Sequence, residues 1–214
     1  MKTRQSSTAA LIPLIAALAA VGAQLRFTLG PIPFTLQNTA VALAGLLLRP
    51  PQALLSMLLY LGLIAIGLPL ASGFRGGFPT LFGYTAGYLW GFAVSAPLIS
   101  VLARAYLKSR GRRLWETSVA DRVVLTLLVT LGMAPTYLLG FLVFAHYALP
   151  DTGLYNWSQE AAQYAGFAGL EGKGLVFAAS VLIFLPQDTL MDHPLAVALG
   201  ASLSRKLWER GVLE

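Results

Sequence analysis

The feature that most constrains the fold is the length of the stretches that carry no charged side chain. Residues 8–25 contain none, and residues 51–70 contain none either. A helix of about 20 mostly apolar residues crosses the roughly 30 Å hydrocarbon core of a membrane. The whole chain is only 11% charged, whereas a soluble domain carries about 25%. The sequence therefore predicts an integral membrane protein and excludes a soluble or disordered chain.

Apolar segments separated by polar or proline-containing turns predict a single all-α domain over residues 1–214 with six membrane-spanning helices. The predicted spans are 8–25, 37–48, 51–70, 80–107, 119–147 and 186–207. The apolar lead-in 174–185 is too short to span, and we expect it to be either re-entrant or continuous with the last helix through a kink at Pro186. The polar stretch 150–173 is predicted to be an outer loop.

The distribution of lysine and arginine predicts the orientation, because these residues stay preferentially on the cytoplasmic side. If both termini are cytoplasmic, the outer side receives only Arg26, Arg75 and Lys173. The inner side receives Lys2, Arg4, Arg49, Arg104, Lys108, Arg110, Arg112, Arg113, Arg122, Arg205, Lys206 and Arg210. The sequence therefore predicts a multi-pass protein of the cell membrane. The net charge of +6 is then a topology signal, and we expect no nucleic-acid partner.

Two carboxylates in the last predicted helix are costly in lipid and therefore informative. Asp188 and Asp192 lie four residues apart, on one helical face, and His193 follows. Such a group could bind a metal or act in acid–base catalysis, but no HExxH or GxSxG motif and no cysteine is present. The alternative is that Asp192 or His193 hydrogen-bonds the break made by Pro194. We expect Asp188 to bind a ligand, with no metal site and no catalytic residue.

Two loops predicted on the outer side, GPIPFTLQN and ASGFRGGFP, combine neutral polar groups, glycines and one cation. Their candidate ligand-binding residues are Thr35, Gln37, Asn38, Arg75, Gly76 and Gly77. Convergent polar groups of this kind are typical of a pocket for a small, partly apolar molecule. Ordinary turns are the alternative.

The first predicted helix carries a stripe of small residues at helical spacing. Its members are Ala16, Ala19, Ala20 and Ala23. Such stripes let helices approach closely in lipid. The spacing leaves open whether the partner is another helix of this chain or a second membrane protein.

Four motifs follow one another along the chain: PIPFTLQNTAVALAGLLL, LLYLGLIAIGLPL, SGFRGGFPTLFGYTAGYLWGF and FLPQD. Together they resemble the BioY family, the biotin-binding S-component of energy-coupling-factor (ECF) vitamin transporters. The resemblance implies a six-helix protein with an outward-facing biotin site and neither catalysis nor a cofactor. It also implies partners: a membrane coupling protein, contacted by alanines of the first helix, and two ATPase subunits, or self-association if the protein is solitary. The chain itself has no P-loop motif for ATP.

The resemblance also implies roles for individual residues. Thr35 and Gln37 match the family's PxTxQ pattern, and Gly76, Gly77 and Tyr88 fit its glycine-rich second loop and the helix that follows. Pro13 occupies the first position of the family's usual alanine pair.

Asp188 falls on the aspartate of the family's PGDxxK motif, which is expected to bond the ureido ring of biotin. Gln187 replaces the glycine of that motif, and Met191 replaces the lysine expected to meet biotin's carboxylate. Arg75 is the candidate substitute for this lysine and His193 the second, and Met191→Lys would restore the family pattern. A different vitamin, or a membrane-embedded enzyme using Asp188, Asp192 and His193, remains the alternative.

Overall fold

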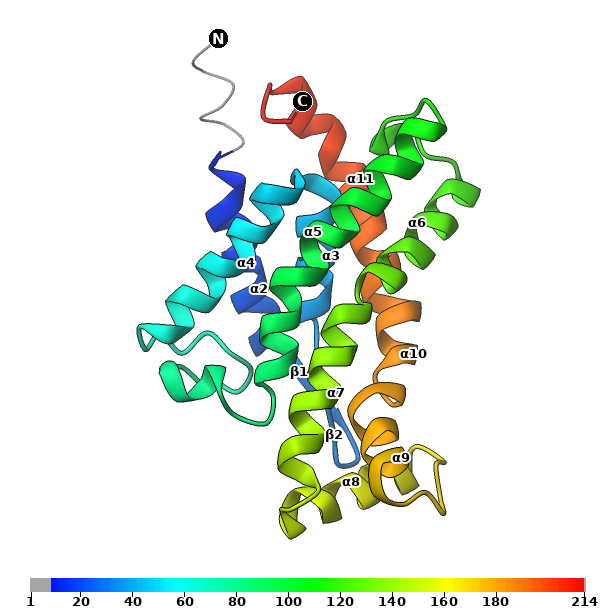
Figure 1. Cartoon of the computed structure of the whole chain (residues 1–214). Helices are drawn as coiled ribbons and strands as arrows, with labels where there is room; N and C mark the ends of the chain where they lie inside the picture. Colours follow the sequence, from blue (N-terminus) through cyan, green and yellow to red (C-terminus); the bar gives the residue numbers. More distant parts are fainter. Residues whose placement is uncertain (1–8, 214) are drawn as a thin grey trace.

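The computed structural model describes residues 9–213 as a bundle of helices with one β-hairpin (Figure 1). The helices are α2 (Leu11–Gln24), α3 (Gln37–Leu47), α4 (Pro50–Ala65), α5 (Ala86–Ser109), α6 (Val119–Gly132), α7 (Ala134–Ala148), α8 (Thr152–Tyr164), α9 (Gly172–Phe177), α10 (Leu185–Gln187) and α11 (His193–Glu209). Short 3-10 turns, η1 (Phe78–Leu81) and η2 (Leu114–Glu116), and π-helical segments, η3 (Ala178–Leu182) and η4 (Asp188–Asp192), complete the chain. Lys2 and Arg4, predicted on the inner side, lie outside the described residues.

Helix α3 is the central element of the bundle and packs against α2, α5 and α11. Its sequence, QNTAVALAGLL, is rich in small side chains, and almost all of its residues are buried. A Cβ added to Gly45 would lie 2.5 Å from Cβ of Ile99 on α5, so glycine is required for this close approach. The position of α3 also places Gln37 and Asn38, at its start, inside the bundle.

The β-hairpin is the main departure from the predicted all-α fold. Strands β1 (Arg26–Leu29) and β2 (Ile32–Thr35) pair antiparallel, with Arg26 opposite Thr35. In β2 the side chains of Ile32 and Phe34 are buried while those between them are not, the period-2 alternation of a half-buried strand. Gly30, with φ of 58°, occupies the turn. The all-α prediction is therefore wrong for this segment. The prediction of a mostly helical fold is confirmed for the rest of the described chain.

The polar stretch 150–173, predicted as an outer loop, contains helix α8. Asp151 caps its start by accepting a hydrogen bond from the backbone N–H of Leu154 at 2.9 Å. Ser158, Ala161 and Ala162 form its buried face. The segment therefore contains an amphipathic helix, which the sequence analysis missed because so many of its residues are polar.

The last part of the chain, Gly172–Glu209, forms one long apolar helical unit. Its π-helical segments η3 and η4 lie on either side of Pro186. In the structure the lead-in 174–185 is helical up to Leu182 and is joined to the last helix through the turn residues Ile183 and Phe184. Within the described residues, three helical units are long and apolar enough to cross a membrane: Ala86–Ser109, Val119–Ala148 and Gly172–Glu209. Helices α2 and α4 are apolar but shorter.

The two ends of the bundle differ in character. The start of α2, the end of α11 and the α3–α4 and α5–α6 junctions lie at one end, whereas the hairpin and α8 lie at the other (Figure 1). The double proline Pro50–Pro51 begins α4, as predicted from the sequence.

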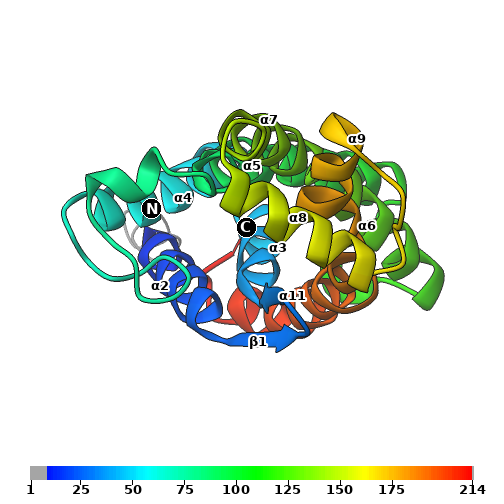
Figure 2. The same ribbon diagram turned by 90° about the horizontal axis from the view of Figure 1, so that it is seen from below.

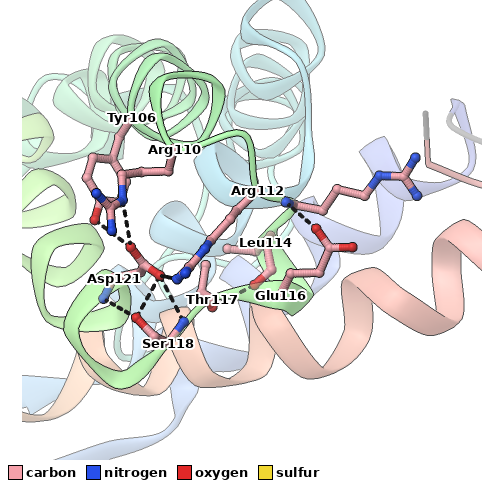
Figure 3. Close-up of polar contacts among 9 residues, drawn as sticks. Tyr106, Arg110, Arg112, Leu114, Glu116, Thr117, Ser118 and Asp121 are labelled. Carbon is pink, nitrogen blue, oxygen red and sulfur yellow. Dashed lines mark hydrogen bonds and ion pairs between the residues drawn. The ribbon is translucent and has the colours of Figure 1, made fainter.

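The α5–α6 junction is held by a polar network around Asp121, whose side chain is 1% exposed (Figure 3). Asp121 accepts hydrogen bonds from the hydroxyls of Tyr106 at 2.8 Å and Ser118 at 2.7 Å. It also forms ion pairs with Arg110 and Arg112. The basic residues of this junction are therefore fixed by one buried carboxylate.

Candidate ligand-binding site

A cavity of about 540 Å³ lies at the hairpin end of the bundle. Its walls come from the hairpin, the start of α3, the α4–α5 loop, α5, α7, α8 and the segment from η3 to η4. Figure 2 views the bundle from this end, with α8 lying across it. The volume lies within the range of about 300–1,000 Å³ that is typical of small-molecule sites.

Asp188 is the charged group at the bottom of the cavity and is 1% exposed. One carboxylate oxygen accepts a hydrogen bond from Nδ2 of Asn38 at 2.9 Å, and the other accepts from the hydroxyl of Tyr137 at 2.8 Å. A carboxylate has about four acceptor positions. Asp188 is therefore held in place by neutral donors and keeps capacity to accept further hydrogen bonds from a ligand.

Gln187 and Gln37 tie the hairpin and α3 to neighbouring segments. Nε2 of Gln187 donates to the carbonyl of Thr35 at 3.0 Å and to Oδ2 of Asp192 at 3.0 Å. Nε2 of Gln37 donates to the hydroxyl of Tyr60 at 2.8 Å. Both amides line the cavity; the two N–H groups of Gln187 are engaged within the protein, whereas Gln37 keeps one N–H and both residues keep a side-chain oxygen for a ligand.

Aromatic side chains form much of the cavity wall. Tyr88 lines the cavity, and its hydroxyl donates to the carbonyl of Ser180 at 2.6 Å and is therefore engaged within the protein. Phe92, Phe144 and Trp157 line the same space, with Phe144 and Trp157 in an edge-to-face contact at 5.9 Å. Such walls suit an apolar ring system.

Two arginines, Arg26 and Arg75, line the exposed part of the cavity. Arg75 donates to the carbonyl of Ser72 at 3.1 Å and to the hydroxyl of Thr85 at 3.3 Å, and its guanidinium lies 5.7 Å from the ring centre of Tyr84. Arg75 is therefore positioned by its own loop and remains accessible to an anionic group.

The structure brings together seven of the residues predicted to contact a ligand. These are Thr35, Gln37, Asn38, Arg75, Tyr88, Gln187 and Asp188. It places the predicted Gly76 and Gly77 outside the lining. A Cβ on Gly76 would lie 2.3 Å from the carbonyl oxygen of Leu68, and Gly77 has a φ of 84°, so both glycines are needed for the conformation of the loop.

Met191 and His193 also lie outside the cavity lining. Met191 is 38% exposed on the outside of the bundle, because the π-helical segment turns this position away from Asp188. His193 is 0% exposed, and its Nδ1 shares a hydrogen bond of 2.8 Å with the hydroxyl of Thr130. Of the two residues predicted to substitute for the family lysine, only Arg75 lines the cavity. Arg26, which was not predicted, lines it as well.

The alanine stripe of the first helix is buried against other helices of the same chain. Ala16, Ala19, Ala20 and Ala23 are 1%, 0%, 8% and 0% exposed, and α2 packs against α3 and α4. The structure therefore supports the contact within the chain, one of the two alternatives that the spacing left open. The exposed face of α2 consists instead of Pro13, Leu14, Ala17, Leu18 and Val21.

Several cavity residues escape prediction from the sequence. Tyr137, which donates to Asp188, and Trp157, which lines the wall, lie in segments without a recognisable motif. An aromatic residue in an apolar span is not by itself a signal of a binding role, so the sequence does not single out Tyr137. Among residues 9–213, no cluster of three His, Cys, Asp or Glu side chains could hold a metal.

An apolar helical bundle that encloses a cavity with a buried carboxylate, aromatic walls and cations at its mouth defines a solute-binding membrane protein. The family can be stated more narrowly. The family model described as "BioY family" matches residues 1–209, and the chain belongs to the BioY family.

Relatives support this assignment. The chain is 35% identical over 150 residues to "Probable biotin transporter BioY" of Pyrococcus horikoshii, an alignment that covers 67% of this chain and 86% of the relative. It is 42% identical over 90 residues to "Biotin transporter BioY" of Thermotoga maritima, covering 42% of this chain and 53% of the relative.

A solved structure has the same fold. With a TM-score of 0.70 and 20% identity, the match covers 96% of this chain and 94% of the other, which is described as the S-component for biotin from an ECF-type ABC transporter.

Proposed function

We propose that the chain captures biotin from the outside of the cell and moves it across the membrane with an ATP-driven partner complex. The observation that carries this proposal is Asp188, a buried carboxylate held by Asn38 and Tyr137 at the bottom of an aromatic cavity. Membership of the BioY family and the names of the relatives, which are biotin transporters, support the same proposal.

The chemistry of biotin matches the layout of the cavity. Its ureido N–H groups would donate to Asp188, a charge-assisted contact worth about 1.5–3 kcal/mol. Its apolar bicycle would lie against Tyr88, Phe92 and Trp157, which line the wall. Its carboxylate would reach the arginines at the mouth, where a guanidinium can bind both oxygens.

The proposed topology has six spans and cytoplasmic termini. The uneven distribution of lysine and arginine supports it, as does the location of the α5–α6 junction and the end of α11 at one end of the bundle (Figure 1). The cavity then opens to the outside. Because the sequence contains no P-loop, energy would come from a membrane coupling protein and two ATPase subunits, or the protein would act alone or as an oligomer.

An enzyme built on Asp188, Asp192 and His193 is not favoured. The curated relatives are named as transporters, and neither Asp192 nor His193 lines the cavity. The proposed role uses no cofactor.

The decisive experiment identifies the ligand. The chain, purified in detergent or nanodiscs, is analysed by mass spectrometry for co-purifying small molecules and titrated with biotin and with other vitamins. We expect one biotin per chain and no comparable binding of thiamine or riboflavin. Tighter binding of another vitamin, or a stoichiometric divalent ion with hydrolytic activity, would contradict the proposal.

A further inference from the structure

Two aspartates occupy the ends of the π-helical segment η4, and only one of them has a role in the proposed binding of biotin. Asp188 is 1% exposed and Asp192 is 0% exposed. They lie four residues apart at the two ends of η4, which places their carboxyl groups next to each other on one face of the helix. Asp188 lines the cavity, whereas Asp192 does not. The ligand site therefore has a fully buried second acid next to its binding carboxylate.

The donors around the two carboxyl groups are unequal. Asp188 accepts hydrogen bonds on both oxygens, from Asn38 and from Tyr137. Asp192 accepts on Oδ2 from Gln187 at 3.0 Å, but its buried Oδ1 has no hydrogen-bond donor. Thr39 of α3 lies beside Asp192, and its hydroxyl does not satisfy hydrogen-bond geometry either. The surroundings thus stabilise a negative charge on Asp188 better than on Asp192.

The groups that face the pair carry no balancing positive charge. Tyr137 of α7 and Tyr88 of α5 are neutral phenols, and His193 is bonded to Thr130 of α6. Among residues 9–213, no lysine or arginine forms an ion pair with either aspartate. Two ionised carboxylates on adjacent positions of one buried helical face, without a cation, repel each other strongly.

We propose that Asp188 and Asp192 together hold one proton at neutral pH, carried by Asp192. The proton converts Asp192 into a neutral donor toward Asp188, and Asp188 stays ionised as the acceptor for the ligand. Asp192 is then a positioning residue: it orients the binding carboxylate and limits the pair to one negative charge. This inference rests on the proposed function of Asp188.

Infrared spectroscopy tests the proton directly, without any ligand. The full chain in nanodiscs at neutral pH should show the C=O stretch of a protonated carboxylic acid, shifted in D2O. The band should be lost in Asp192→Asn and kept in Asp121→Asn, because hydrogen bonds from Ser118 and Tyr106 and the ion pairs with its arginine partners stabilise the ionised form of Asp121. Absence of the band in the unaltered protein, or its persistence in Asp192→Asn, would overturn the proposal.

Binding measurements test the positioning role. Asparagine reproduces a neutral donor, so Asp192→Asn should keep the biotin dissociation constant within about threefold, whereas Asp192→Leu removes the donor and should weaken binding about tenfold. A loss in Asp192→Asn as large as in Asp188→Asn would mean that a charge on Asp192 is required. Unchanged binding in Asp192→Leu would mean that Asp192 positions nothing.

A third measurement, the pH dependence of biotin binding, uses the unaltered protein. Its result therefore does not depend on whether a variant folds. As the pH rises and the acid band disappears, a second negative charge develops beside Asp188, and biotin binding should weaken over the same pH range. Unchanged affinity across that range would contradict the inference. Failure of the unaltered protein to bind biotin at all would instead refute the proposed function, while leaving the infrared result to decide on the proton.

Discussion

The indole nitrogen of Trp157 donates a hydrogen bond to the backbone carbonyl of Pro31 over 3.1 Å. This contact joins α8 to the tip of the hairpin, two segments that the sequence separates by 126 residues. The ring of Tyr164, also on α8, packs against Gly30, where an added Cβ would lie 2.6 Å from it. The hairpin and α8 are therefore joined and form a cover on one side of the cavity that both of them line.

Asp188→Asn should weaken biotin binding by at least about tenfold, or roughly 1.4 kcal/mol. The substitution keeps the size of the side chain but replaces an acceptor with a donor and removes the charge. Isothermal titration of the purified protein measures the effect. Asp121→Asn, at the opposite end of the bundle, serves as the control and should bind normally. An unchanged dissociation constant for Asp188→Asn in a folded protein would refute the assignment.

Trp157→Phe should speed biotin release several-fold. Phenylalanine keeps most of the aromatic wall but cannot donate to Pro31, so the cover loses a hydrogen bond worth about 1 kcal/mol. Dissociation can be followed by chasing labelled biotin with unlabelled biotin. Trp115→Phe is the matched control, because Trp115 stacks with Trp208 and Arg113 far from the cavity. Equal release rates in the two variants would mean that the contact does not hold the cover.

Arg75→Ala should weaken biotin more than a neutral biotin amide, because only the acid can pair with a guanidinium. Arg26→Ala should behave in the same way if the two cations share the carboxylate. Met191→Lys should not rescue the loss, since Met191 is 38% exposed and lies outside the cavity. Equal weakening of acid and amide would leave Arg75 only a role in its loop.

Ala17→Trp should stop ATP-driven uptake while leaving biotin binding to the isolated chain nearly intact. Ala17 lies on the exposed face of α2 together with Pro13, and bulk there prevents close helix contact. Ala16→Trp is the matched comparison: Ala16 is 1% exposed, so overpacking should lower stability by about 1–3 kcal/mol and reduce binding and uptake together. Normal uptake by Ala17→Trp would remove this face from the coupling surface.

Gly87→Ala should lower the thermal stability of the protein. A Cβ at Gly87 would lie 2.0 Å from the carbonyl oxygen of Leu139, so α5 and α7 would be pushed apart at a cost of about 1–3 kcal/mol. Gly62→Ala on α4 has no atom within 4 Å of the added Cβ and should be neutral or slightly stabilising. Similar melting temperatures for the two variants would contradict the close packing of α5 on α7.

The sequence predicts the membrane class and the key carboxylate well, because hydropathy and intramembrane charge are local properties that need no knowledge of packing. Thr35, Asn38 and Asp188 are likewise predicted as cavity residues. The sequence does not predict which way a side chain points once the helices have packed. Position 191 has a suitable spacing from Asp188 and the alanines of α2 have a suitable size, but the wide turn of η4 and the packing of α2 direct them elsewhere. Tyr137 is missed because an aromatic residue in an apolar span carries no positional signal.

The π-helical segments that flank Pro186 have a consequence for how this part of the chain can vary. Each wide turn accommodates residues that a regular α-helix would not, and an α-helix rotates by about 100° per residue. Deleting one residue from the regular turns of α9 would rotate Asp188 by about 100° away from Asn38 and Tyr137. Deleting one residue from η3 would instead let the wide turn become α-helical and would leave Asp188 facing the same way. The orientation of Asp188 therefore depends on where the chain between Gly172 and Asp188 changes length, because η3 can absorb the loss of one residue and the regular helical turns cannot.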